Sequence, residues 1–344
     1  MMRVFLTLLC AIFAANTLHA QTMTAVAVSP DGKTVLAAGD NRTLYTLDAE
    51  TLDVIDRKYI PAMVRELTYS ADGSRIFMRM DNRDFRAHSA GSFKKLYEVE
   101  NISSMSIAAD TDRIALLEDN YNAGVLHIVR GANGKTIRKI DFPETDIEQV
   151  AISADGSFAM VLTDDDKSED EPKESPPSEL KGYDKYVFRQ QNDGYTSQIL
   201  NVDLSKGTHT IADTFYRIGY PFQVRMLGDK MAFINSATDS GLVGTDGAAQ
   251  LINLGDSYVA AGRISDDGTS IVLTSGNDIT YHALNAGVAA EASREMEAAD
   301  IDGPSERVTA MDEAADGTMY MVTSGYRIWK IAPDAAEPVV RPVF

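Results

Sequence analysis

A short phrase built around aspartate and glycine recurs along the chain, and it restricts the fold more than any other feature of the sequence. It first occurs as Val28-Ser29-Pro30-Asp31-Gly32-Lys33. Similar phrases follow at 69–74, 108–111, 152–157, 264–269 and 314–318. The aspartates Asp31, Asp72, Asp110 and Asp155 are 41, 38 and 45 residues apart. A sequence period of this length indicates one small supersecondary unit repeated many times.

Each unit has the pattern of four short strands joined by turns. In the first unit, alternating apolar residues occupy 25–28, 34–38, 43–47 and 54–59, with turn residues between them. A degraded seventh copy of the phrase lies at 227–230, 38 residues before Asp267. One four-stranded meander cannot cover both of its faces, but seven arranged radially cover each other. The sequence therefore predicts an all-β fold, a seven-bladed β-propeller of four-stranded antiparallel blades, with the first strands lining the axis.

The first 20 residues have the pattern of an export signal. Arg3 precedes an apolar run from Val4 to Ala15, and Leu18-His19-Ala20 provides a cleavage site before Gln21. The run is shorter than the roughly 20 residues that a membrane-spanning helix needs, so we expect no membrane span. We expect a signal peptide at 1–20 and a periplasmic or secreted protein. The single cysteine, Cys10, would leave with the signal, so no disulfide is expected.

The remaining residues, 21–344, are predicted to form one propeller domain. Its blades are expected near 22–62, 63–101, 102–145, 146–217, 218–256, 257–303 and 304–344. The first unit begins with a first strand, and the last unit ends with a fourth strand at 339–344. We therefore expect the ring to close without a borrowed strand, through apolar packing between blades one and seven.

The first unit resembles a known class of repeat. The run 29–33 followed by 37–48 is similar to a blade of WD-repeat or YVTN-type propellers, and the similarity extends over 22–344. The third strands lack the Trp-Asp ending, and no Gly-His pair precedes each unit, so the resemblance is to the looser bacterial, exported relatives. It implies the propeller fold and leaves the function open, because such propellers include both binding modules and enzymes.

An acidic segment interrupts the fourth blade between its second and third strands, as an insert at 164–182. Between 164 and 177 there are seven acids, two lysines and three prolines. Such a segment cannot pack a core, so we expect a solvated loop. The alternative is a binding segment for a basic partner or for calcium, which takes oxygen ligands. The acids concerned are Asp164, Asp165, Asp166, Glu169, Asp170 and Glu171. No cofactor is expected apart from this calcium alternative.

The turns between second and third strands are predicted to emerge together on one face of the ring. Aspartate and asparagine in them satisfy backbone groups of the turn. Arginine and tyrosine are not required by turn geometry and are enriched at protein interfaces. We therefore expect a partner-binding surface, formed by Asp40, Arg42, Asp81, Arg83, Asp119, Tyr121 and Tyr326.

Linear motifs for catalysis are absent from the sequence. The four histidines beyond the signal are His88, His127, His209 and His282, and their spacing does not match a zinc site. No Gly-x-Ser-x-Gly motif, phosphate-binding loop or cofactor fingerprint occurs. We nominate no catalytic or metal-ligating residue, and we expect the only tryptophan, Trp329, to pack in the core or between blades.

The charge balance restricts the partners. With 32 basic and 51 acidic residues the formal net charge is -19, which makes nucleic acid an unfavourable partner. We expect a non-catalytic scaffold or accessory subunit that binds a protein with a basic or neutral surface. The alternative is a lactonase-like propeller hydrolase, metal-assisted, whose site at the axial mouth takes one residue from each of several blades.

Overall fold

The computed structural model describes most of the chain beyond the first 21 residues. The described residues are 22–120, 123–143, 145–166, 175–180, 185, 188, 195–215, 223–234, 240–247, 249–252, 259, 261–265, 268–275, 278–285, 288–289, 294–297 and 306–343. The expected signal peptide lies outside them. No helix in this described part has the length and apolar character of a membrane span.

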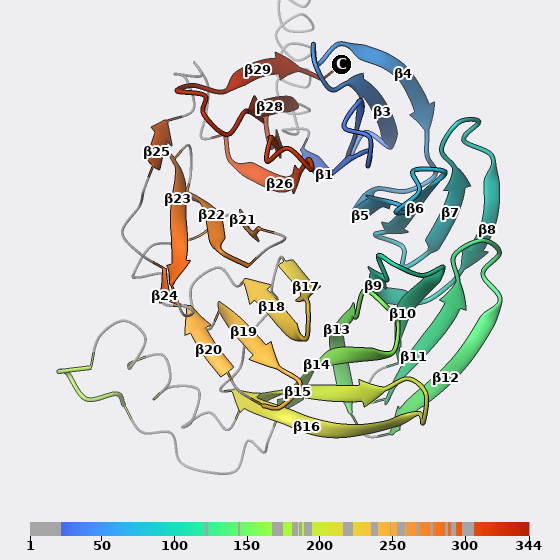
Figure 1. The fold of residues 1–344 in the computed structure, drawn as a ribbon, viewed down its shortest axis with the longest axis vertical. Coiled ribbons are helices and arrows are strands. Elements are labelled where there is room, and N and C mark those ends of the chain that lie inside the picture. Colours follow the sequence, from blue (N-terminus) through green and yellow to red (C-terminus); the bar gives the residue numbers. More distant parts are fainter. Residues whose placement is uncertain are drawn as a thin grey trace, which may run out of the picture.

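Seven antiparallel sheets follow one another around a ring, which confirms the predicted propeller (Figure 1). Each sheet is one blade, and in each blade the strands pair in chain order. Blade 1 contains β1 (Met23–Val28), β2 (Thr34–Gly39), β3 (Thr43–Asp48) and β4 (Val54–Tyr59). Blade 2 contains β5 (Val64–Tyr69), β6 (Arg75–Met80), β7 (Phe85–Ser89) and β8 (Lys95–Val99). Blade 3 contains β9 (Ile102–Ile107), β10 (Arg113–Asp119), β11 (Ala123–Arg130) and β12 (Thr136–Pro143).

The other four blades repeat this plan. Blade 4 contains β13 (Asp146–Ile152), β14 (Phe158–Asp166), β15 (Tyr195–Asp203) and β16 (Thr208–Phe215). Blade 5 contains β17 (Gln223–Leu227), β18 (Lys230–Ile234), β19 (Ser240–Gly244) and β20 (Ala249–Ile252). Blade 6 contains β21 (Ala261–Ile264), β22 (Ser270–Ser275), β23 (Asp278–Asn285), β24 (Val288–Ala289) and β25 (Arg294–Glu297), and the last two pair with different parts of β23. Blade 7 contains β26 (Val308–Glu313), β27 (Met319–Thr323), β28 (Arg327–Ile331) and β29 (Val339–Pro342).

The start of the acidic insert differs from the expectation. Strand β14 continues through Asp166, and Asp164, Asp165 and Asp166 pair with Ser197, Thr196 and Tyr195 of β15. These three acids were expected in a solvated loop, and they lie instead in a regular strand, because the β14–β15 hairpin is longer than the repeat suggests. Glu169, Asp170 and Glu171 lie outside the described residues.

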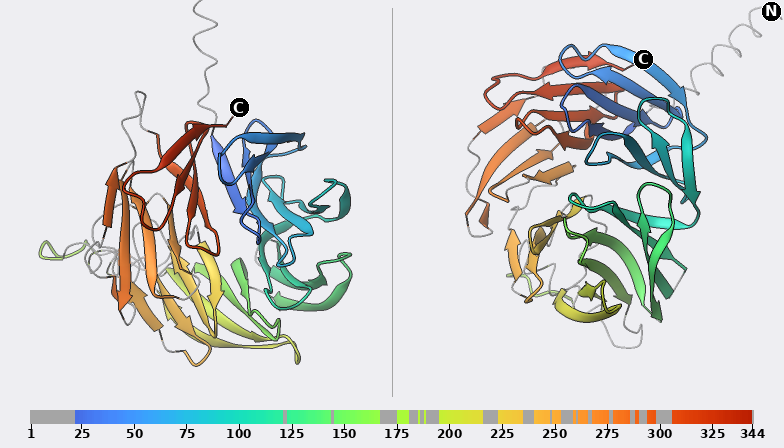
Figure 2. Two further views of the ribbon diagram at one scale, coloured as in Figure 1. Left: turned by 45° about the horizontal axis from the view of Figure 1, so that its top comes forward. Right: turned by 45° about the vertical axis from the view of Figure 1, so that its right-hand side comes forward.

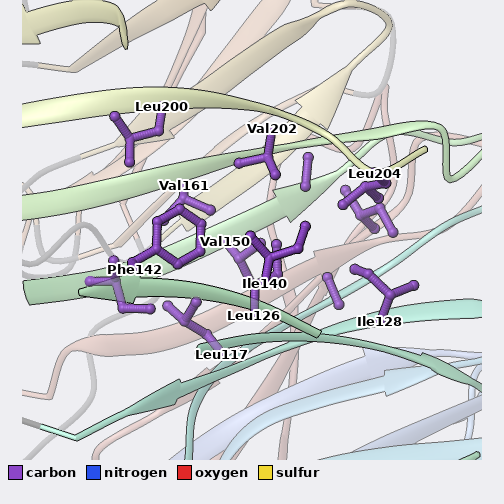
Figure 3. Packing of buried hydrophobic residues seen from close by; sticks show 14 of the residues in the cluster. Leu117, Leu126, Ile128, Ile140, Phe142, Val150, Val161, Leu200, Val202 and Leu204 are labelled. Carbon is purple, nitrogen blue, oxygen red and sulfur yellow. The ribbon is translucent and has the colours of Figure 1, made fainter. Parts of the chain in front are cut away.

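Apolar side chains fill every seam between neighbouring blades. The described residues form seven buried clusters, and each cluster draws on two adjacent blades. The largest joins blades 3 and 4, where Phe142 packs among leucines, isoleucines and valines of both blades (Figure 3). Trp329 is fully buried in the cluster between blades 6 and 7, as predicted. A blade is therefore stabilised mainly by its neighbours, as in other repeat architectures.

The recurring Asp-Gly phrase forms the turn between the first and second strands. In blade 1 the Asp31 carboxylate accepts hydrogen bonds from the Ser29 hydroxyl at 2.7 Å and the Lys33 amide at 3.1 Å. Gly32 has a φ of 68°, in the left-handed region that glycine adopts without strain. The equivalent turn at Asp72 repeats these contacts. The phrase therefore recurs because each blade needs the same tight turn.

The ring closes between blades 7 and 1 without a borrowed strand. Every strand of blade 7 comes from the C-terminal part of the chain, and every strand of blade 1 comes from its N-terminal part. The two sheets lie side by side, so packing between them closes the ring (Figure 2). One buried cluster contains Met23, Val26 and Leu47 of blade 1 together with Tyr320 and Ile328 of blade 7. The expected apolar packing is therefore present at the closing seam.

Candidate functional site

The axis of the propeller contains a cavity of about 670 Å³. Its wall consists almost entirely of residues from the first strands, and all seven blades contribute. One lining residue from each blade in turn is Thr24, Arg65, Met105, Gln149, Arg225, Arg263 and Asp312. A concave site that collects one side chain from each of several blades is the usual place for a ligand in a ring of this kind.

Five of the seven first strands share an irregularity near their beginning. In blades 1, 2, 3, 4 and 7 the pairing with the second strand shifts register there, as in a β-bulge. In blades 1, 3 and 7 the residue at the shift is Thr24, Ser103 or Thr309, and its hydroxyl group donates to a carbonyl of the second strand. In blades 2 and 4 the residue is charged, Arg65 and Glu148. The first strands therefore differ from blade to blade at a structurally equivalent position, and Thr24, Arg65 and Thr309 at this position line the cavity.

The first strand is the inner edge of each sheet, so alternate amide groups along it point away from the second strand. Polar side chains of the preceding blade accept hydrogen bonds from several of them. Glu66 Oε2 accepts from the Met105 amide at 3.3 Å, and the Ser104 hydroxyl accepts from the Val150 amide at 3.2 Å. Both acceptors stand at the position directly after the register shift. We call such a contact an axial staple: a first-strand side chain bonded to a first-strand amide of the next blade.

A second level of axial staples lies two residues further along the strand. The Ser106 hydroxyl accepts from the Ile152 amide at 3.0 Å. At the closing seam Asp312 Oδ2 accepts from the Val28 amide at 2.9 Å. The other oxygen, Asp312 Oδ1, lies 3.1 Å from Nη1 of Arg263 in blade 6. Asp312 therefore joins three consecutive blades.

The cavity wall is basic in a strongly acidic chain. The lining includes four arginines (Arg65, Arg79, Arg225 and Arg263) and two acids (Glu66 and Asp312), whereas the whole sequence has a formal charge of -19. Arg79 donates from Nε to Glu66 Oε1 at 2.6 Å. The Glu66 side chain keeps 29% of its surface open to the cavity, but it lies deep between blades, and this desolvation raises the pKa of its carboxyl although Arg79 acts to lower it.

The turn residues nominated from the sequence share an unusual backbone conformation. Arg42, Arg83 and Tyr326 have φ values of 57°, 66° and 58°, in the left-handed region that non-glycine residues rarely adopt. Each follows its second strand at the same position. The carbonyl group of each of these three residues also accepts a backbone hydrogen bond from a residue just beyond the fourth strand of its blade. The donors to Arg42, Arg83 and Tyr326 are the amides of Ile60, Ile102 and Val343, respectively. A backbone hydrogen bond from the segment beyond the fourth strand therefore helps to fix the geometry of each turn.

Tyr326 differs from the two arginines because its side chain is buried. It is 6% exposed, its hydroxyl group donates to Asp40 Oδ1 at 3.1 Å, and it accepts from the Asn41 amide at 3.0 Å. The expectation that Tyr326 belongs to an exposed partner-binding surface is therefore wrong for its side chain. The reason is Gly39: with no side chain there, the tyrosine ring can enter the seam between blades 7 and 1.

The remaining nominated residues divide into three groups. Asp40 is exposed, but it also accepts the Thr22 amide at 3.0 Å, so it has a structural role at the closing seam. Arg42 and Asp81 are exposed, and Arg83 is partly exposed. Asp119 lies at the end of β10 and its side chain is not described, while Tyr121 lies outside the described residues. The structure thus places Arg42, Asp81 and Arg83 together on one face, in the turns of two adjacent blades.

The histidines lie apart, each with partners in its own surroundings. Nδ1 of His88 is 3.0 Å from the Phe93 carbonyl, Nε2 of His127 is 2.8 Å from Glu118, and Nε2 of His282 is 2.8 Å from the Thr280 hydroxyl. His209 packs against the Phe142 ring. Within the described part of the chain, no three His, Cys, Asp or Glu side chains gather as metal ligands would.

Sequence reasoning missed the cavity residues, although a signal for them exists. When the blades are aligned on their Asp-Gly turns, Glu66, Ser104 and Gln149 occupy one position of the first strand, and Ser106, Arg263 and Asp312 occupy another. Polar residues at inward positions of an otherwise apolar strand indicate contacts with a neighbouring blade or a ligand. No family model and no curated protein matches this chain.

Proposed function

We propose that this protein is an exported, non-catalytic propeller that binds another protein through the face bearing Arg42, Asp81 and Arg83. One observation carries the proposal: arginines occupy the left-handed position of the same turn in blades 1 and 2. Glycine or asparagine would adopt this conformation at lower cost, since the left-handed region costs other residues roughly 1 kcal/mol. Strained residues persist more often where function requires the side chain.

The surroundings of these arginines support an interface. The Arg42 side chain is exposed and has no hydrogen bond or ion pair with any described residue, so folding does not use its charge. Asp81 in the next blade is exposed as well. Arginine is enriched at protein interfaces because its planar group forms several directed hydrogen bonds. Arg42 and Asp81 place opposite charges on one face. They suit a partner whose surface is basic or neutral and which carries an acidic group that can bind arginine.

Crosslinking in cells, followed by capture of the tagged protein, tests this surface. The informative variant is R42N/R83N, because asparagine tolerates the left-handed conformation and the turn should fold normally. The matched control is K33N/K135N, which removes the same charge from exposed lysines in turns on the opposite face. We expect a partner that wild type and control retain and that R42N/R83N loses by at least about tenfold, the effect of a lost charged hydrogen bond. Equal capture by both variants would refute the proposed surface.

Salt provides an independent check. An interface that uses exposed charges weakens as ionic strength rises, because screening shortens the range of the attraction. Binding that is equal in dilute and concentrated salt would contradict a charged interface even if R42N/R83N loses the partner.

The export part of the proposal rests on residues 1–20. Intact mass measurement of the protein purified from its native host tests it, and we expect a chain that begins at Gln21. A chain in the cytoplasm that retains Met1 would refute export. The Asp-Gly turn further supports a distant relation to WD-repeat and YVTN-type propellers. The metal-assisted hydrolase stays an alternative, and a large thermal shift with calcium or zinc would favour it.

A further inference from the structure

Among the described residues, axial staples join blades 2 and 3, blades 3 and 4, and blades 7 and 1, whereas none joins blades 1 and 2. The two positions that supply the acceptors at those three seams are occupied in blade 1 by Ala25 and Ala27, which have none. The amide that corresponds to those of Met105 and Val150 belongs to Leu67. The Ser70 amide donates to the Arg75 carbonyl, so alternate residues from Ser70 back along β5 pair with β6 and the Leu67 amide points away from it.

The cavity borders this edge of β5. Leu67, Ala25 and Val26 all line the cavity. A backbone amide that faces a polar cavity without a protein acceptor is bonded by water or by a ligand. The sector between blades 1 and 2 therefore offers a free backbone donor, the Leu67 amide. The equivalent amides in blades 3 and 4, of Met105 and Val150, already donate to Glu66 and Ser104.

Arg65 adds a positive charge beside this amide. It stands at the register shift of β5, where blades 1, 3 and 7 have a hydroxyl residue bonded within the protein. Its side chain is exposed, lines the cavity, and forms no hydrogen bond or ion pair with any described residue. By contrast, Arg79 and Arg263 in the same cavity are paired with Glu66 and Asp312. Arg65 is thus a cation in the cavity that the fold does not neutralise.

We propose that the axial cavity binds a small molecule bearing an oxyanion, a carboxylate or phosphate group, with Arg65 and the Leu67 amide as donors. Arginine forms paired hydrogen bonds with either group, and a backbone amide adds a charge-assisted bond of fixed direction. The low-dielectric walls of a narrow cavity concentrate the field of its arginines, which distinguishes this site from the acidic exterior. The site is independent of the protein-binding face proposed above, because it uses none of Arg42, Asp81 or Arg83.

Calorimetric titration with citrate and with inorganic phosphate, each at constant ionic strength with chloride as the competing salt, tests the site. We expect the full-length mature chain to bind at least one of the two, and R65Q to bind it at least about tenfold more weakly, as the loss of one charge-assisted hydrogen bond implies. Binding of citrate alone identifies a carboxylate ligand, and binding of phosphate alone a phosphate ligand. No binding of either anion by wild type would overturn the proposal.

A second variant separates the site from a general effect of charge. A25S places a hydroxyl group where Ser104 stands in blade 3, and that hydroxyl should accept from the Leu67 amide. We expect A25S to weaken anion binding without any change in net charge. The control K33N loses a positive charge from a residue that does not line the cavity, and it should bind as wild type does. Equal affinities of R65Q and wild type, or an equal loss in K33N, would overturn the assignment to this sector.

Discussion

Blade 1 has a different kind of seam on each side. Toward blade 7 no chain connection exists between the adjoining strands, and side chains supply the links: Asp312 to the Val28 amide, Thr309 to the Met23 carbonyl at 2.7 Å, and Tyr320 to the Ala49 carbonyl at 2.9 Å. Toward blade 2 the chain itself continues through residues 60–63. That seam contains the bond from Thr24 to the Val64 carbonyl, and it leaves a cleft of about 620 Å³ between the blades.

The comparison shows where the ring can leave polar groups for a ligand. At the closing seam no chain connection joins the adjoining strands, and Asp312 supplies an acceptor for the Val28 amide there, although Ala310 directly after the register shift has none. At the seam between blades 1 and 2, chain continuity holds the blades together, and Ala25 and Ala27 can replace acceptors without opening the ring. We infer that binding function and ring closure are assigned to opposite sides of the same blade.

Replacement of Asp312 by alanine should have the largest effect on stability. The Val28 amide would lose its acceptor and Arg263 would lose its acidic partner at 3.1 Å while keeping Glu313 at 3.5 Å, so we expect a loss of about 2–3 kcal/mol in the free energy of unfolding. Urea unfolding followed by fluorescence of Trp329, the only tryptophan, measures it. D312N keeps an acceptor oxygen and should lose roughly half as much. A loss below about 1 kcal/mol in D312A would contradict the role of this staple.

Removal of the Tyr326 hydroxyl group should have the next largest effect. Y326F keeps the ring in the closing seam but removes the bonds to Asp40 and Asn41, so we expect a loss of about 1–2 kcal/mol. The double variant Y326F/D40N should lose little more than Y326F, because Y326F has already removed the bond to Asp40 and asparagine keeps an oxygen that can accept from the Thr22 amide. Full additivity in this double-mutant cycle would show that the contact does not stabilise the seam.

A new staple at the other seam should have a smaller effect of opposite sign. A25S supplies the acceptor that the Leu67 amide lacks, so we expect the free energy of unfolding to rise by up to about 1 kcal/mol. The matching change at a stapled seam is S104A, which should lower it by a similar amount because the Val150 amide loses its acceptor. If A25S destabilises the protein as much as S104A does, the seam between blades 1 and 2 does not lack an acceptor that the seam between blades 3 and 4 has.

Acid should weaken four of the Asp-Gly turns together, those of Asp31, Asp72, Asp155 and Asp316, with the smallest effect for each one. Hydrogen bonds from Ser70 and Ser74 lower the pKa of Asp72 from 3.8 to about 2, and hydrogen bonds likewise lower the pKa values of Asp31, Asp155 and Asp316. A carboxyl whose pKa is lowered by folding stabilises the folded state above its unfolded pKa, and this contribution disappears as the pH falls from about 4 to about 2.

Urea midpoints measured across that pH interval check the prediction. D72N removes one titrating group and should show a shallower pH dependence than wild type. An unchanged slope would mean that the Asp72 carboxyl does not contribute through its ionised form.

The repeat predicted the propeller because its period and its turns are local properties. Ser29, Asp31 and Gly32 form their turn with one another, so six residues of sequence contain the necessary information. The same holds for the buried strands, whose alternation indicates their two covered faces. Trp329 in an apolar strand was predicted to be buried for the same reason.

The site was harder to predict because it depends on which residues of different blades meet. Tyr326 and Arg42 occupy the same turn position with nearly the same φ, yet one is buried and the other exposed. The difference arises from Gly39, distant in sequence, which makes room for the tyrosine. Arg65 was likewise overlooked, because only the pairing of β5 with β6 reveals that it stands at a register shift facing the axis.

The exchange rates of the Val28 and Leu67 amide protons test the central claim most directly. Both belong to first strands and point away from the second strand, but only Val28 has a side-chain acceptor from the preceding blade. We predict slow exchange for Val28 and fast exchange for Leu67 by nuclear magnetic resonance, with the Leu67 amide becoming protected when the anion bound in the calorimetric titration is added. Equal protection of the two amides in the unliganded protein, or a Leu67 amide that the anion leaves unchanged, would contradict the account.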